Sequence, residues 1–179
     1  MGRLASAGAR AGLILLLHCA VGAQPLPQER EVHAVFLLNL ARFVRWPERA
    51  FASDDAPLVI GILPEDPLAP ILEEAAAGES VGRHPMVIRR IQTADDLARS
   101  HMVHFPRTRL ADAVPLIAQI QGAPVLLVSD ADGFLRLGGH VQMFNRGGQV
   151  KLRLDVENLR RAELTASSQL LRVAEIVKK

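Results

Sequence analysis

The chain has 179 residues, of which 49% are hydrophobic and 22% are charged, with one cysteine and a formal net charge of +2. A chain of this length can bury one sizeable apolar core, so we expect one globular domain. No cluster of lysines and arginines with interleaved aromatic residues occurs, and nucleic acid binding therefore has no support.

The first 23 residues have the layout of a secretory signal peptide. Arg3 and Arg10 precede the apolar run 11–17, no acidic residue occurs, and the small-residue exit 21–23 suits cleavage before Gln24. The apolar run is too short to cross a bilayer, which takes about 20 apolar residues. We therefore predict a cleaved signal peptide and a periplasmic location for the mature protein.

Cleavage changes the charge and the thiol content of the mature protein, residues 24–179. Loss of Arg3 and Arg10 leaves 19 basic residues against 19 acidic residues. Cys19 also lies in the signal, so the mature domain can form no disulfide and must be held together by packing. The alternative is that Cys19 is lipidated, but His18 before it differs from the small residue that lipidation sites prefer.

The segment from Glu29 to Arg45 has the spacing of an amphipathic helix. Its apolar residues recur in steps of three and four, which predicts one stripe packed on a core, and these are Val32, Val35, Phe36, Leu40, Phe43 and Val44. Trp46 and Pro47 are expected to end the helix, because proline disfavours helical geometry in the residue before it.

Strands and helices then alternate. The apolar run Leu58 to Leu63 predicts a strand buried on both faces, and Asp66 before Pro67 predicts the start of a helix that ends near Ala77. The same alternation continues with a strand at 86–91, a helix at 93–100, a strand at 101–105, a helix at 110–121 and a strand at 124–129. The predicted fold class is α/β, with a mainly parallel central sheet flanked by helices.

The pattern changes after Gly138. Two glycines, 138–139, open a strand, residues 146–148 form a glycine turn, and Val150, Leu152 and Leu154 then alternate with charged residues, which together predict an antiparallel β-hairpin at the sheet edge. Two helices, 156–162 and 167–178, are expected to complete the chain, and apolar residues of the second should point inward, namely Leu170, Leu171, Val173, Ala174 and Val177.

Signatures of catalysis are absent from the sequence. There is no G-x-S-x-G, Walker A, G-x-G-x-x-G, H-E-x-x-H or C-x-x-C pattern, so we predict no enzyme activity, no catalytic residues and no cofactor. His101 and His104 would point to opposite faces of a strand, and Asp130 and Asp132 lack the later ligands of a calcium loop. We therefore predict no metal site.

A small-ligand site remains an alternative at the carboxyl ends of the parallel strands, where open α/β sheets usually bind ligands. The candidate residues are Glu65 and Asp66 after one strand and Asp130 and Asp132 after another. The corresponding function is a periplasmic small-ligand-binding protein without a protein target.

The residues assembled above resemble the YfiR-like family of periplasmic signalling regulators. The resemblance covers nearly the whole mature chain in order, through V-H-A-V-F-L-L-N-L-A-R-F-V-R-W-P at 32–47, L-V-I-G-I-L-P-E-D-P at 58–67, V-G-R-H-P-M-V-I-R-R at 81–90, V-L-L-V-S-D-A-D-G-F at 125–134, G-G-H-V-Q-M-F at 138–144 and S-S-Q-L-L-R-V-A at 167–174.

This resemblance implies a regulator that performs no chemistry itself. Its expected partner is the periplasmic sensor region of an inner-membrane signalling protein, either a diguanylate cyclase or a sensor kinase. Repression of a cyclase would control cyclic di-GMP and biofilm formation, and an outer-membrane lipoprotein would relieve the repression. A homodimer is compatible with the resemblance, whereas the redox control by disulfides proposed for the best-known member is excluded in a mature chain without cysteine.

Partner contact is expected at two places. Phe43 and Trp46 lie at the end of the first helix, and Phe144 and Arg146 lie in the hairpin. Aromatic residues and arginine are preferred anchors of protein interfaces. The alternative for Phe43 and Trp46 is packing in the core.

Overall fold

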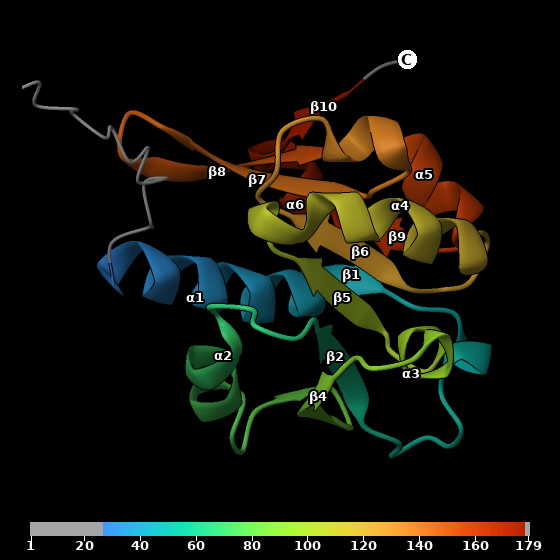
Figure 1. The fold of residues 1–179 in the computed structure, drawn as a ribbon. Coiled ribbons are helices and arrows are strands. Elements are labelled where there is room, and N and C mark those ends of the chain that lie inside the picture. The colour runs from blue at the N-terminus through green and yellow to red at the C-terminus, as the bar shows by residue number, and fades with distance from the viewer. Residues whose placement is uncertain (1–26, 178–179) are drawn as a thin grey trace, which may run out of the picture.

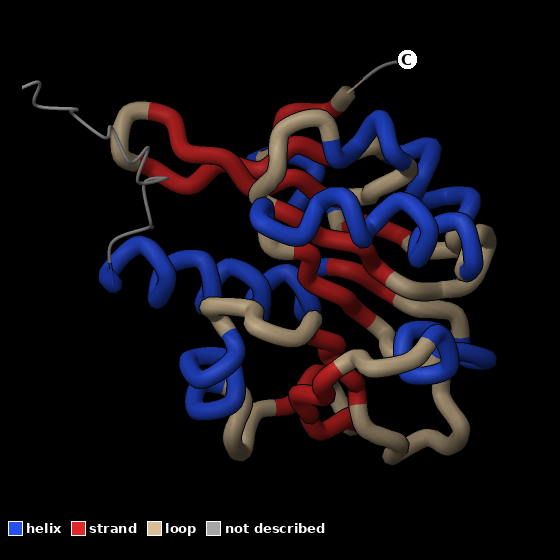
Figure 2. The backbone as a smooth tube through the Cα atoms, in the orientation of Figure 1, coloured by secondary structure: helices blue, strands red, loops and turns tan. Residues whose placement is uncertain are grey.

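The main feature of the computed structural model, which describes residues 27–177, is an eight-stranded sheet with helices on both sides (Figures 1 and 2). The helices are α1 (Pro27–Phe43), α2 (Ala69–Ala75), α3 (Ala94–Ala98), α4 (Leu110–Gln119), α5 (Val156–Arg161) and α6 (Ser168–Val173). Three 3-10 turns are η1 (Glu48–Ala50), η2 (Arg107–Arg109) and η3 (Phe134–Leu137). None of the helices within residues 27–177 is long and apolar enough to cross a membrane. The predicted signal peptide lies outside the described residues.

Within residues 27–177 the strands form two sheets. Those of the main sheet, in spatial order, are β10 (Glu175–Ile176), β8 (Gln149–Leu154), β7 (Val141–Arg146), β6 (Leu126–Ser129), β5 (Met102–Phe105), β2 (Leu58–Ile62), β4 (His84–Arg90) and β3 (Ser80–Val81). The second sheet pairs β1 (Val44–Arg45) with β9 (Thr165–Ala166).

Five neighbouring strands of the main sheet are parallel, which confirms the predicted mainly parallel α/β fold. These are β4, β2, β5, β6 and β7. The chain runs from β2 to β4 on one side and then crosses to β5 on the other side of β2. The winding direction therefore reverses between β2 and β5, and this is where open α/β sheets form a crevice at their carboxyl ends.

Two hydrophobic cores lie on opposite faces of this sheet. The first, which we call the α1 core, joins α1, α2, α5 and α6 to the sheet. The second, the α4 core, joins α3, α4 and η3 to the other face. All five residues of β2 are buried between the two cores, as the apolar run 58–63 predicts.

The first helix differs from the prediction at its C-terminal end. It stops at Phe43, two residues before the predicted limit, because Val44 and Arg45 pair with β9 in antiparallel register. Pairing with a segment about 120 residues later cannot be read from local periodicity. The predicted apolar stripe is only partly buried, because Leu40 and Val44 are buried whereas Val32 and Val35 are exposed. The other buried apolar residues of the helix lie outside the predicted stripe, namely Ala34, Leu37, Leu38 and Ala41.

The C-terminal region also differs from the prediction. The predicted helix 167–178 ends at Val173, since the following residues form β10 and the Val177 N–H bonds to the Leu154 carbonyl. Leu170 is buried as predicted, but Leu171 and Val173 are exposed.

The predicted hairpin is present, but it does not form the sheet edge. Its turn uses Gly147 and Gly148, both at positive φ (61° and 76°). Its first strand, β7, continues the parallel sheet beside β6, and β10 pairs with the outer side of β8. The antiparallel prediction is therefore right for the β7–β8 pair and wrong for the β6–β7 pair.

Two buried histidines hold strands in place. His101 accepts the Val59 N–H at Nδ1 (3.0 Å), and its Nε2 donates to the Ala50 carbonyl (3.0 Å). His140 accepts the Leu127 N–H at Nδ1 (3.0 Å) and so connects β6 to the start of β7. Both rings act as fixed neutral hydrogen-bonding groups.

Burial of His140 should make stability depend on pH. Burial lowers the pKa of His140 from 6.5 to about 4, against a weaker opposing effect of Asp155. Between these values the unfolded chain binds a proton that the folded chain does not, so the free energy of unfolding falls as the pH falls from about 6.5 to about 4, by about 3 kcal/mol for this residue. In His140→Asn the new Oδ1 can still accept the Leu127 N–H.

We expect His140→Asn to show a smaller loss of stability than the parent between pH 7 and pH 4.5 in urea unfolding. The remaining loss should come from His33 and His101, whose pKa values burial also lowers. Identical pH profiles for parent and variant would contradict this role of His140.

Candidate functional site

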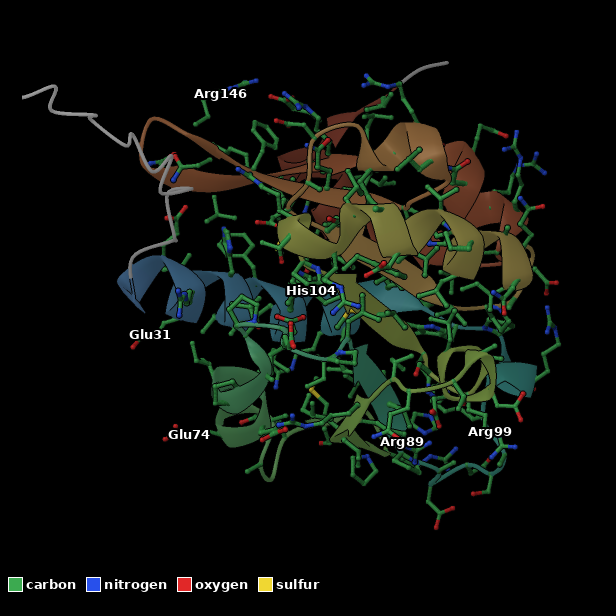
Figure 3. All side chains as sticks on the ribbon, in the orientation of Figure 1. Glu31, Glu74, Arg89, Arg99, His104 and Arg146 are labelled. Carbon is green, nitrogen blue, oxygen red and sulfur yellow. The ribbon has the colours of Figure 1, made fainter. Side chains whose placement is uncertain are left out.

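A buried, hydrogen-bonded histidine–aspartate pair occupies the carboxyl edge between β2 and β5. The Nδ1 of His104 at the end of β5 donates to Asp66 Oδ2 (2.6 Å), and the two side chains are 3% and 0% exposed. The other carboxylate oxygen, Oδ1, accepts the Leu68 N–H (2.9 Å). Figure 3 shows His104 in the middle of the molecule. Asp66 thus links the loop after β2 to β5.

This arrangement corrects the predicted role of Asp66 as the N-cap of a helix. The helix α2 begins three residues later, at Ala69, and Leu68 occupies its N-cap position without a side-chain cap. Asp66 instead closes a turn, because its carbonyl accepts the Ala69 N–H (3.1 Å). The Asp66 side chain therefore accepts hydrogen bonds from the turn and from His104, and it does not cap the helix.

His33 of α1 covers the same edge. Its ring is buried, and its Nε2 has no hydrogen-bond partner among residues 27–177. Burial lowers the pKa of His33, while the carboxylates of Asp130 and Glu29 raise it and the charges of His104 and Arg107 lower it further. His33 is therefore close enough to His104 and to the loops that contain Arg107 and Asp130 for their charges to affect its pKa.

The four predicted ligand residues all follow parallel strands at this edge, but they have separate environments. Asp66 is engaged as described, while Asp130 Oδ1 accepts the Arg107 N–H (2.8 Å). Asp132 Oδ1 accepts from the Gln142 amide (2.9 Å), and the Glu65 side chain is 87% exposed. Within residues 27–177 no group of three or more histidine, cysteine or acidic side chains could hold a metal ion. Ligand binding by these four residues stays a prediction.

An apolar groove lies between α1, α6 and β8. Its volume is about 600 Å³, and its lining residues are Val35, Phe36, Asn39, Leu40, Phe43, Leu152, Gln169, Leu170, Arg172 and Val173. Val35 is 51% exposed and Val173 is 71% exposed, although both are aliphatic. Apolar periodicity assigned both residues to the core, because it does not show that α6 is only six residues long or which face of α1 meets the sheet.

The predicted partner-binding residues are not brought together. Phe43 lines the groove, but Trp46 is half-buried and its Nε1–H donates to the His101 carbonyl (2.9 Å). Phe144 and Arg146 belong to the hairpin, where the guanidinium groups of Arg146 and Arg153 lie 5.1 and 4.0 Å from the Phe144 ring centroid. Figure 3 shows Arg146 well away from His104.

Comparison with known proteins places the chain in a family. A family model described as YfiR/HmsC-like matches residues 30–175. The chain belongs to the YfiR/HmsC-like family. This is a regulatory family whose members are periplasmic and act by binding membrane signalling proteins. No protein with a curated description is similar to the chain.

Two solved structures share the fold of this chain, although their sequences are only distantly similar to it. A conserved domain protein from Vibrio cholerae O1 biovar El Tor has a TM-score of 0.55 and 13% identity over 83% of this chain. The ABC domain in complex with L-Trp from Streptococcus pneumonia has a TM-score of 0.51 and 12% identity, also over 83%. This chain spans 60% of the length of each. At these identities the likeness concerns the fold alone.

The Asp66–His104 pair should stabilise the folded state. Asp66→Ala leaves the His104 Nδ1–H and the Leu68 N–H buried without an acceptor, which should lower the free energy of unfolding by roughly 2–4 kcal/mol. Urea unfolding at neutral pH measures the loss. The control is Glu65→Gln at the neighbouring exposed position, which should change stability by less than about 0.5 kcal/mol. Equal stability of Asp66→Ala and the parent would rule out this role.

Proposed function

We propose that this chain is an exported periplasmic regulator that binds the periplasmic sensor region of an inner-membrane signalling protein and controls its output without catalysis. The favoured partner is a diguanylate cyclase, whose repression lowers cyclic di-GMP. The family match over residues 30–175 is the observation that carries this proposal. The predicted signal peptide in the first 23 residues supports export.

The groove between α1 and α6 is the proposed contact surface. Exposed aliphatic side chains around a concave surface are typical of protein interaction sites. Arg172 lines the groove, and no carboxylate of residues 27–177 lies within 4.0 Å of it. The expected occupant is therefore an apolar segment of the partner's sensor region with an acidic residue beside it.

The alternative function is a small-ligand-binding protein without a protein target. The two functions differ in what deletion of the gene would do. Loss of a regulator changes the output of the membrane signalling protein, measured as cyclic di-GMP in the cell. Unchanged cyclic di-GMP, together with a large thermal shift in the presence of a metabolite, would favour the alternative.

We expect Val173→Glu to weaken partner binding at least about tenfold, because a carboxylate would replace the most exposed apolar side chain of the groove. The measurement is calorimetric titration of mature protein with the periplasmic region of a candidate signalling protein encoded nearby. The matched control is Val114→Glu on α4, which lies on the other face of the sheet and is 49% exposed.

Three outcomes contradict parts of this proposal. Equal weakening by both variants would exclude the groove as the contact surface. A switch from dimer to monomer in Val173→Glu with unchanged partner binding would assign the groove to a second copy of this chain. Failure of the parent protein to bind any sensor region encoded nearby would count against the regulatory function itself.

A further inference from the structure

A second cavity lies at the opposite edge of the sheet, where β6 and β7 begin. Its volume is about 380 Å³, within the range of small-molecule sites. It is lined by the end of α4, the segments that lead into β6 and β7, and α5. Its lining includes Ile117, Ile120, Leu127, His140, Asn158 and Arg161.

His140 lines this cavity and carries a hydrogen-bond donor. Its Nδ1 accepts the Leu127 N–H (3.0 Å), so the proton of the neutral ring is on Nε2. No residue in the described part of the chain accepts a hydrogen bond from that Nε2. Burial lowers the pKa of His140 to about 4, which keeps the ring in this neutral form at ordinary pH.

Arg161 supplies a positive charge. Its Nη1 donates to Asn158 Oδ1 (3.3 Å), and Asn158 is itself held by its Nδ2, which donates to the Gly139 carbonyl (2.9 Å). Across residues 27–177 no carboxylate lies within 4.0 Å of Arg161, whereas the adjacent Arg160 pairs with Glu157 (3.1 Å). The guanidinium of Arg161 is therefore positioned at the cavity but not neutralised there.

The remaining wall determines how an occupant would lie. Ile117 and Ile120 of α4, together with Leu127 of β6, form an apolar surface. The C-terminal ends of α4 and α5 both lie at this cavity, so neither helix dipole favours an anion there, and the attraction must come from the Arg161 guanidinium. An anionic group would thus lie beside Arg161, with its apolar body against the isoleucines.

We propose that this cavity binds a small monocarboxylate with an aliphatic body. The carboxylate would accept from the Arg161 guanidinium and from the His140 Nε2–H, and the aliphatic body would contact Ile117 and Ile120. Neither group is used by the contact surface proposed between α1 and α6. This site is therefore independent of the proposed regulatory function, and its test requires no partner protein.

Calorimetric titration of the mature protein with 4-methylpentanoate, and with 4-methylpentan-1-ol as its uncharged counterpart, tests the proposal. We expect the carboxylate to bind at least about tenfold more tightly than the alcohol. Changes in the amide NMR signals of Leu127 and Gly139 should locate the binding. Equal affinity for the two probes, no binding at millimolar concentration, or signal changes only elsewhere would overturn the proposal.

Two arginine variants provide the matched comparison. Arg161→Gln and Arg160→Gln remove the same charge from neighbouring exposed positions of α5, so folding should be preserved in both. We expect Arg161→Gln to weaken 4-methylpentanoate binding about tenfold and Arg160→Gln to change it less than about twofold. Equal effects would mean a general charge effect and would overturn the assignment to Arg161.

Discussion

The burial of β2 on both faces is the constraint on which the rest of the structure depends. All five of its residues are buried, and it lies between β4 and β5 with a core on either side. A Cβ at Gly61 would lie 2.6 Å from Ile91 Cδ1, so the β2 backbone and the segment after β4 already touch. A strand enclosed in this way leaves no room for unpaired polar groups, and Asp66 beyond its end is accordingly paired with His104.

Because of this burial, the carboxyl edge of the sheet, where α/β folds usually bind ligands, is closed in this protein, and the open surfaces lie elsewhere. At the carboxyl edge between β2 and β5, the Asp66–His104 pair is enclosed and His33 of α1 is buried beside it. The apolar groove lies instead between α1 and α6, and the cavity with His140 lies at the amino edge of β6 and β7. The first surface is the proposed partner contact, and the second is the proposed site of a small carboxylate.

The architecture fits a family of regulators, because it combines a stable framework with an accessible surface. A regulator needs an accessible surface on a stable framework more than it needs a reactive centre. Here the charged and polar side chains near the sheet mainly hold the framework, as His101 does between Val59 and Ala50. The exposed aliphatic residues Val35 and Val173 lie on α1 and α6, outside the sheet.

The sequence by itself determined the α/β class, the buried central strands and the alternation of strands and helices from 58 to 129, because apolar periodicity reports burial within one segment. It also identified the family and the loops at the carboxyl edge. Only the tertiary structure decided that α1 ends at Phe43, that β10 replaces the end of a helix and that Val173 faces a groove. These features depend on β9, β8 and α1, which are partners distant in sequence, and a local pattern contains no information about such contacts.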